Sequence, residues 1–345
     1  MTTIRIAHSP DADDAFMFHA LLSGKIEHPG LEITEVREDI ESLNQKAREG
    51  VYEVTAISFH AYPSIAGKYV LLTTGACFGD KYGPIVVAPK ALKSKQLLKV
   101  HMGIPGKLTT AFLALKLYEH HVAGDTKSGI CYTQVPFDQI MDQVKEGKLD
   151  AGLVIHEGQL SFGDQGLYKI VDLGEWWHGE TGLPLPLGGI AVRRDLPHDV
   201  IKQLAELIQK SVQYGLEHKE DVLQAALPYA RGLDPERALK FIEMYVNDWT
   251  IDFGRKGLKA LKILLDRGFR EGILKERVDL DECVYDVKKG KLRSELFGEV
   301  LLSEPASESA LEEATAKIDN PDNPDYPAES PEAPESPEAP ESKES

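Results

Sequence analysis

Cysteine is scarce in this sequence: only Cys77, Cys131 and Cys283 occur among 345 residues, with no paired spacing. Such usage supports neither a disulfide framework nor a zinc site, and it fits a reducing compartment. The first residues lack the basic segment and following apolar segment of a secretion signal. No apolar run approaches the roughly 20 residues that span a bilayer. We therefore expect a cytoplasmic protein.

A basic stripe is lacking too. The formal net charge is −17, and residues 303–345 carry −11 of it, with 13 acidic residues against 2 lysines. The rest of the chain is therefore only mildly acidic. An acidic surface repels phosphate backbones and anionic lipid, so we expect neither nucleic acid nor a membrane as a partner. A monomer or a homodimer is expected.

Familiar catalytic motifs are missing as well. The sequence shows no Ser-His-Asp elbow, zinc-ligand spacing, dinucleotide fingerprint or close carboxylate pair. Hydrolase, metal-dependent and nicotinamide-dependent chemistry therefore have no support.

Short apolar runs alternate with helix-period segments through the first 195 residues, which is the pattern of βα units. The chain after Pro197 has helical periodicity only. The predicted strands are 3–8, 31–37, 54–57, 69–77, 85–88, 99–104, 129–134, 151–155, 167–173 and 188–192. The predicted helices are 16–22, 40–49, 109–121, 137–145, 200–216, 219–227, 234–246 and 254–271.

Two βα sets followed by returning helices predict a two-lobed α/β protein with a central cleft. The chain would cross between lobes near 88–92 and 187–193. Lobe 1 would comprise residues 1–90 and 190–300, and lobe 2 residues 91–189. Residues 303–345 are rich in proline, glutamate and serine, which predicts a disordered acidic tail. Ligands of open α/β sheets bind where strands end, so functional residues should follow strands directly.

Two loops that follow strands carry polar residues. The first begins at Ser9 and contains Asp13 and Asp14, whose oxygens can bind a ligand or merely cap the next helix. The second leads through two glycines to Thr109, Thr110 and Ala111. Helix-start amides there can hold a carboxylate or carbonyl oxygen, although ordinary capping by Thr109 is the alternative. Ser58 and Leu187 are also assigned to the substrate site.

His156 directly follows the apolar strand 151–155. An imidazole at a strand exit can accept a proton near neutral pH without large tuning of its pKa. Glu157 would either orient it or face solvent. His8 and His60 are weaker candidates because they too follow strands. Residues 176–177 and 181–188 form an apolar segment with two tryptophans, which would either cover a flat ring or pack as a hinge.

These segments resemble the 1,4-dihydroxy-6-naphthoate synthase family, cyclic dehypoxanthinylfutalosine lyases of menaquinone biosynthesis related to type II periplasmic binding proteins. The resemblance runs from about residue 4 to about residue 252. It is carried by Ser9-Pro10 with Asp14 and Phe16-Met17-Phe18, by Gly83-Pro84-Ile85-Val86-Val87, by Gly106 with Thr109-Thr110-Ala111, by Ile155-His156-Glu157 and by residues 181–188.

The resemblance implies that His156 is the catalytic base and that Thr109, Thr110 and Ala111 grip the oxygens of a small-molecule carboxylate. It implies neither a metal nor an organic cofactor. The first loop departs from the family's Ser-Pro-Cys-Pro-Asn-Asp-Thr, because Asp13 replaces an amide donor with a carboxylate and Ala15 lacks a hydroxyl. The alternatives are a non-catalytic cytoplasmic metabolite-binding protein and a chorismate-type dehydratase of the same pathway.

Overall fold

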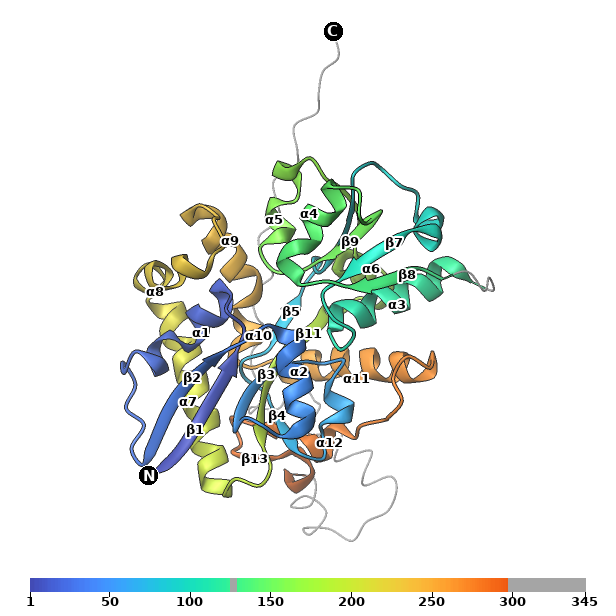
Figure 1. Cartoon of the computed structure of the whole chain (residues 1–345). Helices are drawn as coiled ribbons and strands as arrows, with labels where there is room; N and C mark the ends of the chain where they lie inside the picture. Colours follow the sequence, from blue (N-terminus) through green and yellow to red (C-terminus); the bar gives the residue numbers. More distant parts are fainter. Residues whose placement is uncertain (125–128, 297–345) are drawn as a thin grey trace. The chain divides into compact units, whose positions relative to one another are not determined.

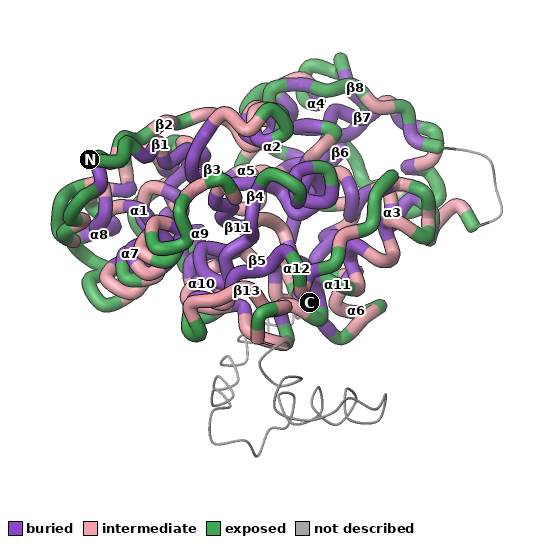
Figure 2. The backbone as a smooth tube through the Cα atoms, turned by 90° about the horizontal axis from the view of Figure 1, so that it is seen from below, coloured by how far each residue is buried: buried purple, intermediate pink, exposed green. Residues whose placement is uncertain are grey.

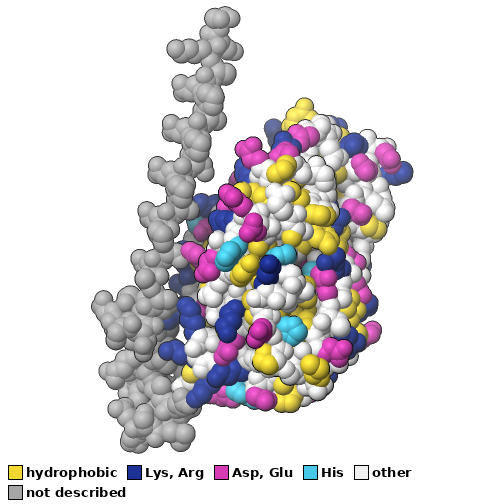
Figure 3. All heavy atoms as spheres, turned by 90° about the vertical axis from the view of Figure 1, so that its left-hand side faces the viewer, with side chains coloured by type: hydrophobic (Ala, Val, Ile, Leu, Met, Phe, Trp, Pro, Cys, Tyr) yellow, Lys and Arg dark blue, Asp and Glu magenta, His cyan; other side chains and the backbone are white. Residues whose placement is uncertain are grey.

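The computed structural model describes residues 1–124 and 129–296 (Figure 1). The predicted disordered tail, 303–345, lies outside the described residues. Among the described residues, no helix has both the length and the apolar character that crossing a membrane requires. Basic and acidic side chains are interspersed over the described face in Figure 3, so that face presents no stripe of one sign.

The larger of the two sheets has eight strands in the order β13-β12-β4-β11-β3-β1-β2, with β5 paired to β11. Strand β1 runs parallel to β2 and β3, whereas β11 runs antiparallel to β3, β4 and β5. The strands are β1 (Thr2–His8), β2 (Leu31–Arg37), β3 (Val54–Ser58), β4 (Tyr69–Leu72), β5 (Cys77–Gly79), β11 (Leu185–Arg193), β12 (Val284–Asp286) and β13 (Lys291–Leu292).

The smaller sheet has five strands in the order β10-β6-β9-β7-β8. They are β6 (Ile85–Ala88), β7 (His101–Ile104), β8 (Cys131–Gln134), β9 (Ala151–Val154) and β10 (Tyr168–Asp172). Strand β9 is buried along its whole length, and its small and apolar residues leave space for α4 (Ile140–Lys145) to pack on it. The carboxyl end of this strand therefore leads straight into the interior of the molecule.

The side chains of the large sheet alternate between two apolar cores. On β11, Ile190 and Val192 pack into one core and Ala191 into the other, as the period of two in a strand requires. The first core holds α1 (Ala12–Leu22), α7 (His198–Glu217), α8 (Lys219–Ala226) and α9 (Pro235–Tyr245), and the second holds α3 (Thr110–Ala123) and α11 (Gly254–Arg270). Figure 2 shows the strands as mainly buried and the outer turns of the helices as exposed.

We call the large sheet with α1, α2 (Ile40–Glu49), α7, α8 and α9 the large lobe, and the small sheet with α4 and α5 (Gly158–Ser161) the small lobe. The α-helices of the described residues also include the short α10 (Asp248–Ile251) and α12 (Leu280–Cys283). Figure 1 shows α1, α8 and α9 grouped beside the large sheet and α4 and α5 beside the small one.

Both predicted crossing points are wrong by several residues. Strand β6 belongs to the small sheet, so the chain leaves the large sheet after Gly79 and enters the small one at Ile85, before 88–92. The return precedes Leu185, because the whole of β11 pairs within the large sheet. The first crossing packs tightly: a Cβ on Gly174 would lie 1.9 Å from the carbonyl oxygen of Tyr82. A glycine is therefore required where α6 (Leu173–Thr181) begins.

Several predicted elements differ from the structure. The strand 69–77 divides into β4 and β5, because Gly75 turns the chain with φ 75°. Residues 176–177 lie in helix α6, which is absent from the predicted helices, and residues 185–188 belong to β11. Asp172 caps α6 by accepting from the Gly174 and Glu175 amides. Strands β12 and β13 lie in the part of the chain predicted to be helical, where two- and three-residue strands leave little periodicity.

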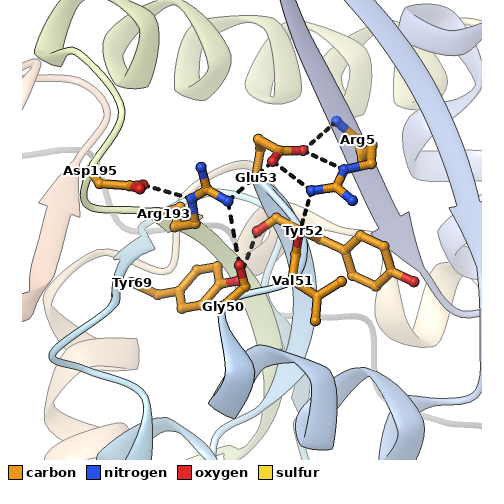
Figure 4. A network of polar contacts seen from close by, with 8 residues as sticks. All are labelled: Arg5, Gly50, Val51, Tyr52, Glu53, Tyr69, Arg193 and Asp195. Carbon is orange, nitrogen blue, oxygen red and sulfur yellow. Dashed lines mark hydrogen bonds and ion pairs between the residues drawn. The ribbon is translucent and has the colours of Figure 1, made fainter.

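An ion-pair network joins β1, β11 and the residue before β3, which are neighbours in the large sheet (Figure 4). Glu53, just before β3, accepts hydrogen bonds from Arg5 Nε at 2.8 Å and from Arg193 Nη1 at 3.2 Å. The Glu53 side chain is only 10% exposed, so its carboxylate depends on these guanidinium groups. Burial raises the pKa of Glu53, but the hydrogen bonds and charge of Arg5 outweigh it and lower the pKa overall.

Candidate active site

A cavity with about 760 Å³ of empty space, part of it open to solvent, lies where strands of both sheets end. All nine side chains predicted for the site line this one cavity, although they come from segments far apart in the sequence. They are Ser9, Asp13, Asp14, Ser58, Thr109, Thr110, Ala111, His156 and Leu187. Apolar residues cover much of the remaining wall: Ile40, Ala56, Ile57, Pro84, Ile155, Ile190 and Phe241.

His156 stands two residues beyond the end of β9, in the small lobe. Its Nδ1 lies 3.0 Å from Oδ2 of Asp11, and its side chain is 17% exposed. Its Nε2 is buried and has no hydrogen-bond partner among the described residues. The Phe137 ring packs against the edge of the imidazole, with 4.8 Å between ring centroids. One ring nitrogen is thus fixed and the other is left for a ligand.

Asp11 is completely buried at the start of α1, in the large lobe. Its Oδ1 accepts from Arg231 Nε at 3.1 Å and from Nη2 at 2.7 Å. Its Oδ2 accepts from the Ser9 hydroxyl and faces His156. Both carboxylate oxygens are therefore occupied, as a buried charge requires.

The electrostatics of the pair favour charge on both partners. Burial alone would lower the pKa of His156, but the charge and hydrogen bond of Asp11, with Glu157 and Asp13, raise the pKa to about 9. Burial alone would raise the pKa of Asp11, but His156, Ser9 and Arg231 hold it well below its ordinary value. At neutral pH the pair is an imidazolium and a carboxylate.

Glu157 neither faces solvent nor hydrogen-bonds to His156. It is buried, and its Oε2 lies 3.4 Å from Nε of Arg231. Neither of its oxygens has a hydrogen-bond partner among the described residues. Burial and the nearby charge of Asp11 raise the pKa of Glu157, against the effect of His156. Arg231 therefore connects the carboxylates at positions 11 and 157.

The first loop brings several carboxylates together, which corrects the sequence-based expectation that no close carboxylate pair exists. Oδ2 of Asp14 accepts from the backbone N–H of Ser9 at 2.7 Å, so this side chain holds the loop. Asp13 is half-buried and accepts no hydrogen bond from the described residues. Burial, followed by the charges of Asp14 and Asp11, raises the pKa of Asp13 well above its usual range.

The threonine hydroxyls at the start of α3 already have partners. Oγ1 of Thr109 accepts from the Phe112 amide at 3.2 Å and donates to the Gly106 carbonyl, which is ordinary helix capping. Oγ1 of Thr110 donates to the Leu187 carbonyl at 2.5 Å. The backbone amides of Thr110 and Ala111 are in the first turn of α3, where N–H groups have no partner within the helix. These amides, rather than the hydroxyls, are the donors left for a ligand.

Ser58 is fixed by Asn44, whose Oδ1 accepts from the Ser58 amide at 2.8 Å. The tryptophans at 176–177 do not line the cavity: Trp177 is buried and donates to the Pro184 carbonyl at 3.2 Å. His8 also has a structural role, since its Nε2 lies 2.9 Å from Oε1 of Glu35.

Sequence reasoning missed four residues at the site. Asp11 is in a loop already singled out, and a carboxylate after a strand was the signal available. Arg231 precedes α9 and has no motif around it, so only the fold places it here. Gln159 and Tyr245 also line the cavity, with 2.7 Å between the tyrosine hydroxyl and the glutamine amide. Within residues 1–124 and 129–296, no group of three His, Cys, Asp or Glu side chains is arranged to hold a metal ion.

A family model and two relatives of known name agree on the family of this chain. Residues 4–270 match the family described as "Menaquinone biosynthesis". The chain is 37% identical to the 1,4-dihydroxy-6-naphthoate synthase of Thermus thermophilus over 273 residues, which covers 79% of this chain and 96% of that protein. It is 35% identical over 275 residues to the protein of the same name from Streptomyces coelicolor, covering 79% and 95%.

Solved structures agree on the fold. A protein of Archaeoglobus fulgidus matches with a TM-score of 0.74 and 43% identity, covering 79% of this chain and 98% of that one. The alkanesulfonate-binding protein SsuA of Xanthomonas axonopodis pv. citri matches with a TM-score of 0.62 and 14% identity, covering 83% and 99%. The predicted two-lobed fold of the periplasmic-binding-protein kind is therefore confirmed for the described residues.

Proposed function

Since this chain belongs to the menaquinone biosynthesis family and is an enzyme of that pathway, we propose that it converts cyclic dehypoxanthinylfutalosine to 1,4-dihydroxy-6-naphthoate. His156 is the general base in this proposal. The observation that carries it is the His156 side chain on the cavity wall, with one nitrogen fixed by Asp11 and with Nε2 lacking a hydrogen-bond partner in the part of the chain that the structure describes. A cytoplasmic site of action, as the sequence predicts, belongs to the same proposal.

The chemistry needs a base and little else. His156 Nε2 takes a proton from carbon of the spiro-cyclic substrate, and the electron pair of the broken C–H bond forms a double bond in the ring. The bond to the sugar-derived fragment breaks, and that fragment leaves with the electron pair. The ring becomes aromatic, which supplies the driving force. The protein therefore has to hold the reacting atoms in place and keep water away.

The cavity offers a seat for each part of such a substrate. Its apolar wall suits a flat ring system, and the unused amides of Thr110 and Ala111 suit the ring's carboxylate. The N-terminal end of the 14-residue helix α3 adds a favourable dipole.

Asp13 is compatible with an anionic substrate for a physical reason. Its raised pKa favours the protonated carboxyl, in which one oxygen carries a hydrogen. A protonated carboxyl donates a hydrogen bond much as the asparagine amide of the resembling family would. In its protonated form Asp13 would therefore keep a donor at this position.

The test is to mix purified protein with cyclic dehypoxanthinylfutalosine and follow the fluorescence of the naphthoate product. His156→Asn should abolish turnover and keep substrate affinity, and His121→Asn, at a half-exposed histidine outside the cavity, should match the wild type. Saturable binding by the folded wild type with no product would support a metabolite-binding protein instead and would refute the proposal.

A further inference from the structure

The contact between His156 and Asp11 joins the two lobes. His156 follows β9 of the small sheet, whereas Asp11 lies between β1 of the large sheet and helix α1. Arg231 precedes α9 of the large lobe, and it contacts both Asp11 and the small lobe's Glu157. Any opening of the cleft between the lobes would separate these partners.

We propose that Asp11 is a positioning residue for His156 and that Arg231 fixes Asp11, so that the base of this enzyme is assembled from both lobes. The proposal rests on the proposed function and deepens it. Asp11 contacts the imidazole, and in this proposal it acts through the orientation and protonation of that ring rather than on the reacting atoms.

The hydrogen bond selects one form of the imidazole. A carboxylate only accepts, so the Nδ1 that faces Oδ2 of Asp11 must carry the proton. The neutral ring then has its lone pair on Nε2, the nitrogen for which residues 1–124 and 129–296 offer no hydrogen-bond partner. Without Asp11 the ring could take the other tautomer, with the lone pair on the wrong side.

Arg231 prevents Asp11 from turning away. Its Nε and Nη2 both donate to Oδ1, at 3.1 and 2.7 Å, so the guanidinium holds one oxygen and leaves Oδ2 for the imidazole. The guanidinium also lies over the Phe137 ring, 4.5 Å from its centroid, on the small-lobe side of the contact. Glu157 cannot replace Asp11, because it pairs with Arg231 and makes no hydrogen bond to His156.

The backbone supports a functional role for this group. Among the described residues, Lys81, His156 and Arg231 are the three non-glycine residues with positive φ, at 65°, 55° and 49°. Left-handed backbone is uncommon for such residues and persists where surrounding contacts enforce it. Two of these three residues, His156 and Arg231, contact Asp11, although they stand 75 positions apart in the sequence.

The charges around His156 come from both lobes. The carboxyl groups of Asp11, Asp13, Asp14 and Glu157 interact with its ring, and Arg231 with Asp138 beside it sets the charge of the surrounding network. Asp11 makes the largest favourable contribution to the imidazolium, which agrees with the geometry. Its removal should therefore make His156 easier to deprotonate.

The experiment compares Asp11→Asn with Asp164→Asn. The first keeps the side chain's shape and removes its charge. The second removes another carboxylate that pairs across the lobes, with Arg237, and that is not among the groups acting on the pKa of His156. In the wild type, kcat/KM should depend on a group that titrates near pH 9. In Asp11→Asn the midpoint of this pH dependence should be at least ~1 pH unit lower, and kcat at the plateau should be at least tenfold lower. Asp164→Asn should keep the wild-type midpoint.

A measurement without substrate separates this proposal from the lyase assignment. With ¹⁵N-labelled histidine, the His156 signals are identified by their loss in His156→Asn, and their titration reports the midpoint and the protonated nitrogen. A wild-type midpoint near 9 with the proton on Nδ1, and a lower midpoint in Asp11→Asn, support the positioning role even if no naphthoate forms. An unchanged midpoint and tautomer in Asp11→Asn overturn it, whatever the activity.

Discussion

The rate of the proposed reaction should rise with pH between 7 and 9. A base acts in its unprotonated form, and the pKa of His156 is about 9. At pH 7 only about one His156 in a hundred is neutral, and at pH 9 about half are, so kcat/KM should increase by about 50-fold between these values. If the imidazolium acted instead as an acid, kcat/KM would be flat to about pH 8 and fall above it.

The assay is the initial rate of naphthoate formation at low substrate concentration, in overlapping buffers of constant ionic strength. The hydroxyl of Tyr245, which lines the cavity, does not interfere, because burial raises its pKa well above the usual value for tyrosine. Circular dichroism at each pH controls for unfolding. A constant or decreasing kcat/KM from pH 7 to 9, with folded protein throughout, would refute the assignment of His156 as the base.

Three further predictions concern stability. Gly174→Ala should lower the free energy of unfolding by about 3 kcal/mol or more, because the new Cβ would meet the Tyr82 carbonyl. Gly179→Ala is the control: its Cβ would have nothing within 4 Å, so the Tm should stay unchanged or rise slightly. Equal Tm values for the two variants would contradict this prediction. Glu53→Gln should lower the free energy of unfolding, measured in urea at pH 7, by about 2 kcal/mol. The difference from wild type should shrink as the pH falls below about 4, because the contacts that lower the pKa of Glu53 stabilise only its ionised form. Because the pKa of His156 is raised in the folded protein, the imidazolium should add about 3 kcal/mol to the free energy of unfolding below about pH 6.5. This contribution should be lost as the pH rises through 9. Unfolding of His156→Asn should lack this loss, and a parallel loss in both proteins would argue against it.

The sequence predicted the parts of the site that depend on local pattern. His156 was identifiable because an apolar strand ends just before it, and the first loop and the start of α3 follow strands in the same way. The roles of the threonine hydroxyls were not predictable, because Thr110 bonds to Leu187, which is distant in the chain. The assignment of these residues to substrate binding stays a prediction.

Long-range arrangement was the main source of error. Arg231 reaches Asp11 across 220 positions of sequence, and no local pattern encodes that contact. Strand β6 reads like any buried strand, and only its pairing with β9 and β10 assigns it to the small sheet. Helix α6 was missed because its two tryptophans and the glycines and prolines near them resemble a loop, although Asp172 supplies a proper cap.

The left-handed backbone at His156 restricts which residues can occupy that position. A β-branched or bulky side chain at φ 55° would strain the turn after β9 before any chemistry was affected. Asparagine tolerates this conformation well, so His156→Asn removes the imidazole without straining the backbone. Alanine or valine would combine the loss of the imidazole with backbone strain. Divergence of this cavity toward another ligand would therefore pass most easily through asparagine, aspartate or glycine at this point of the chain.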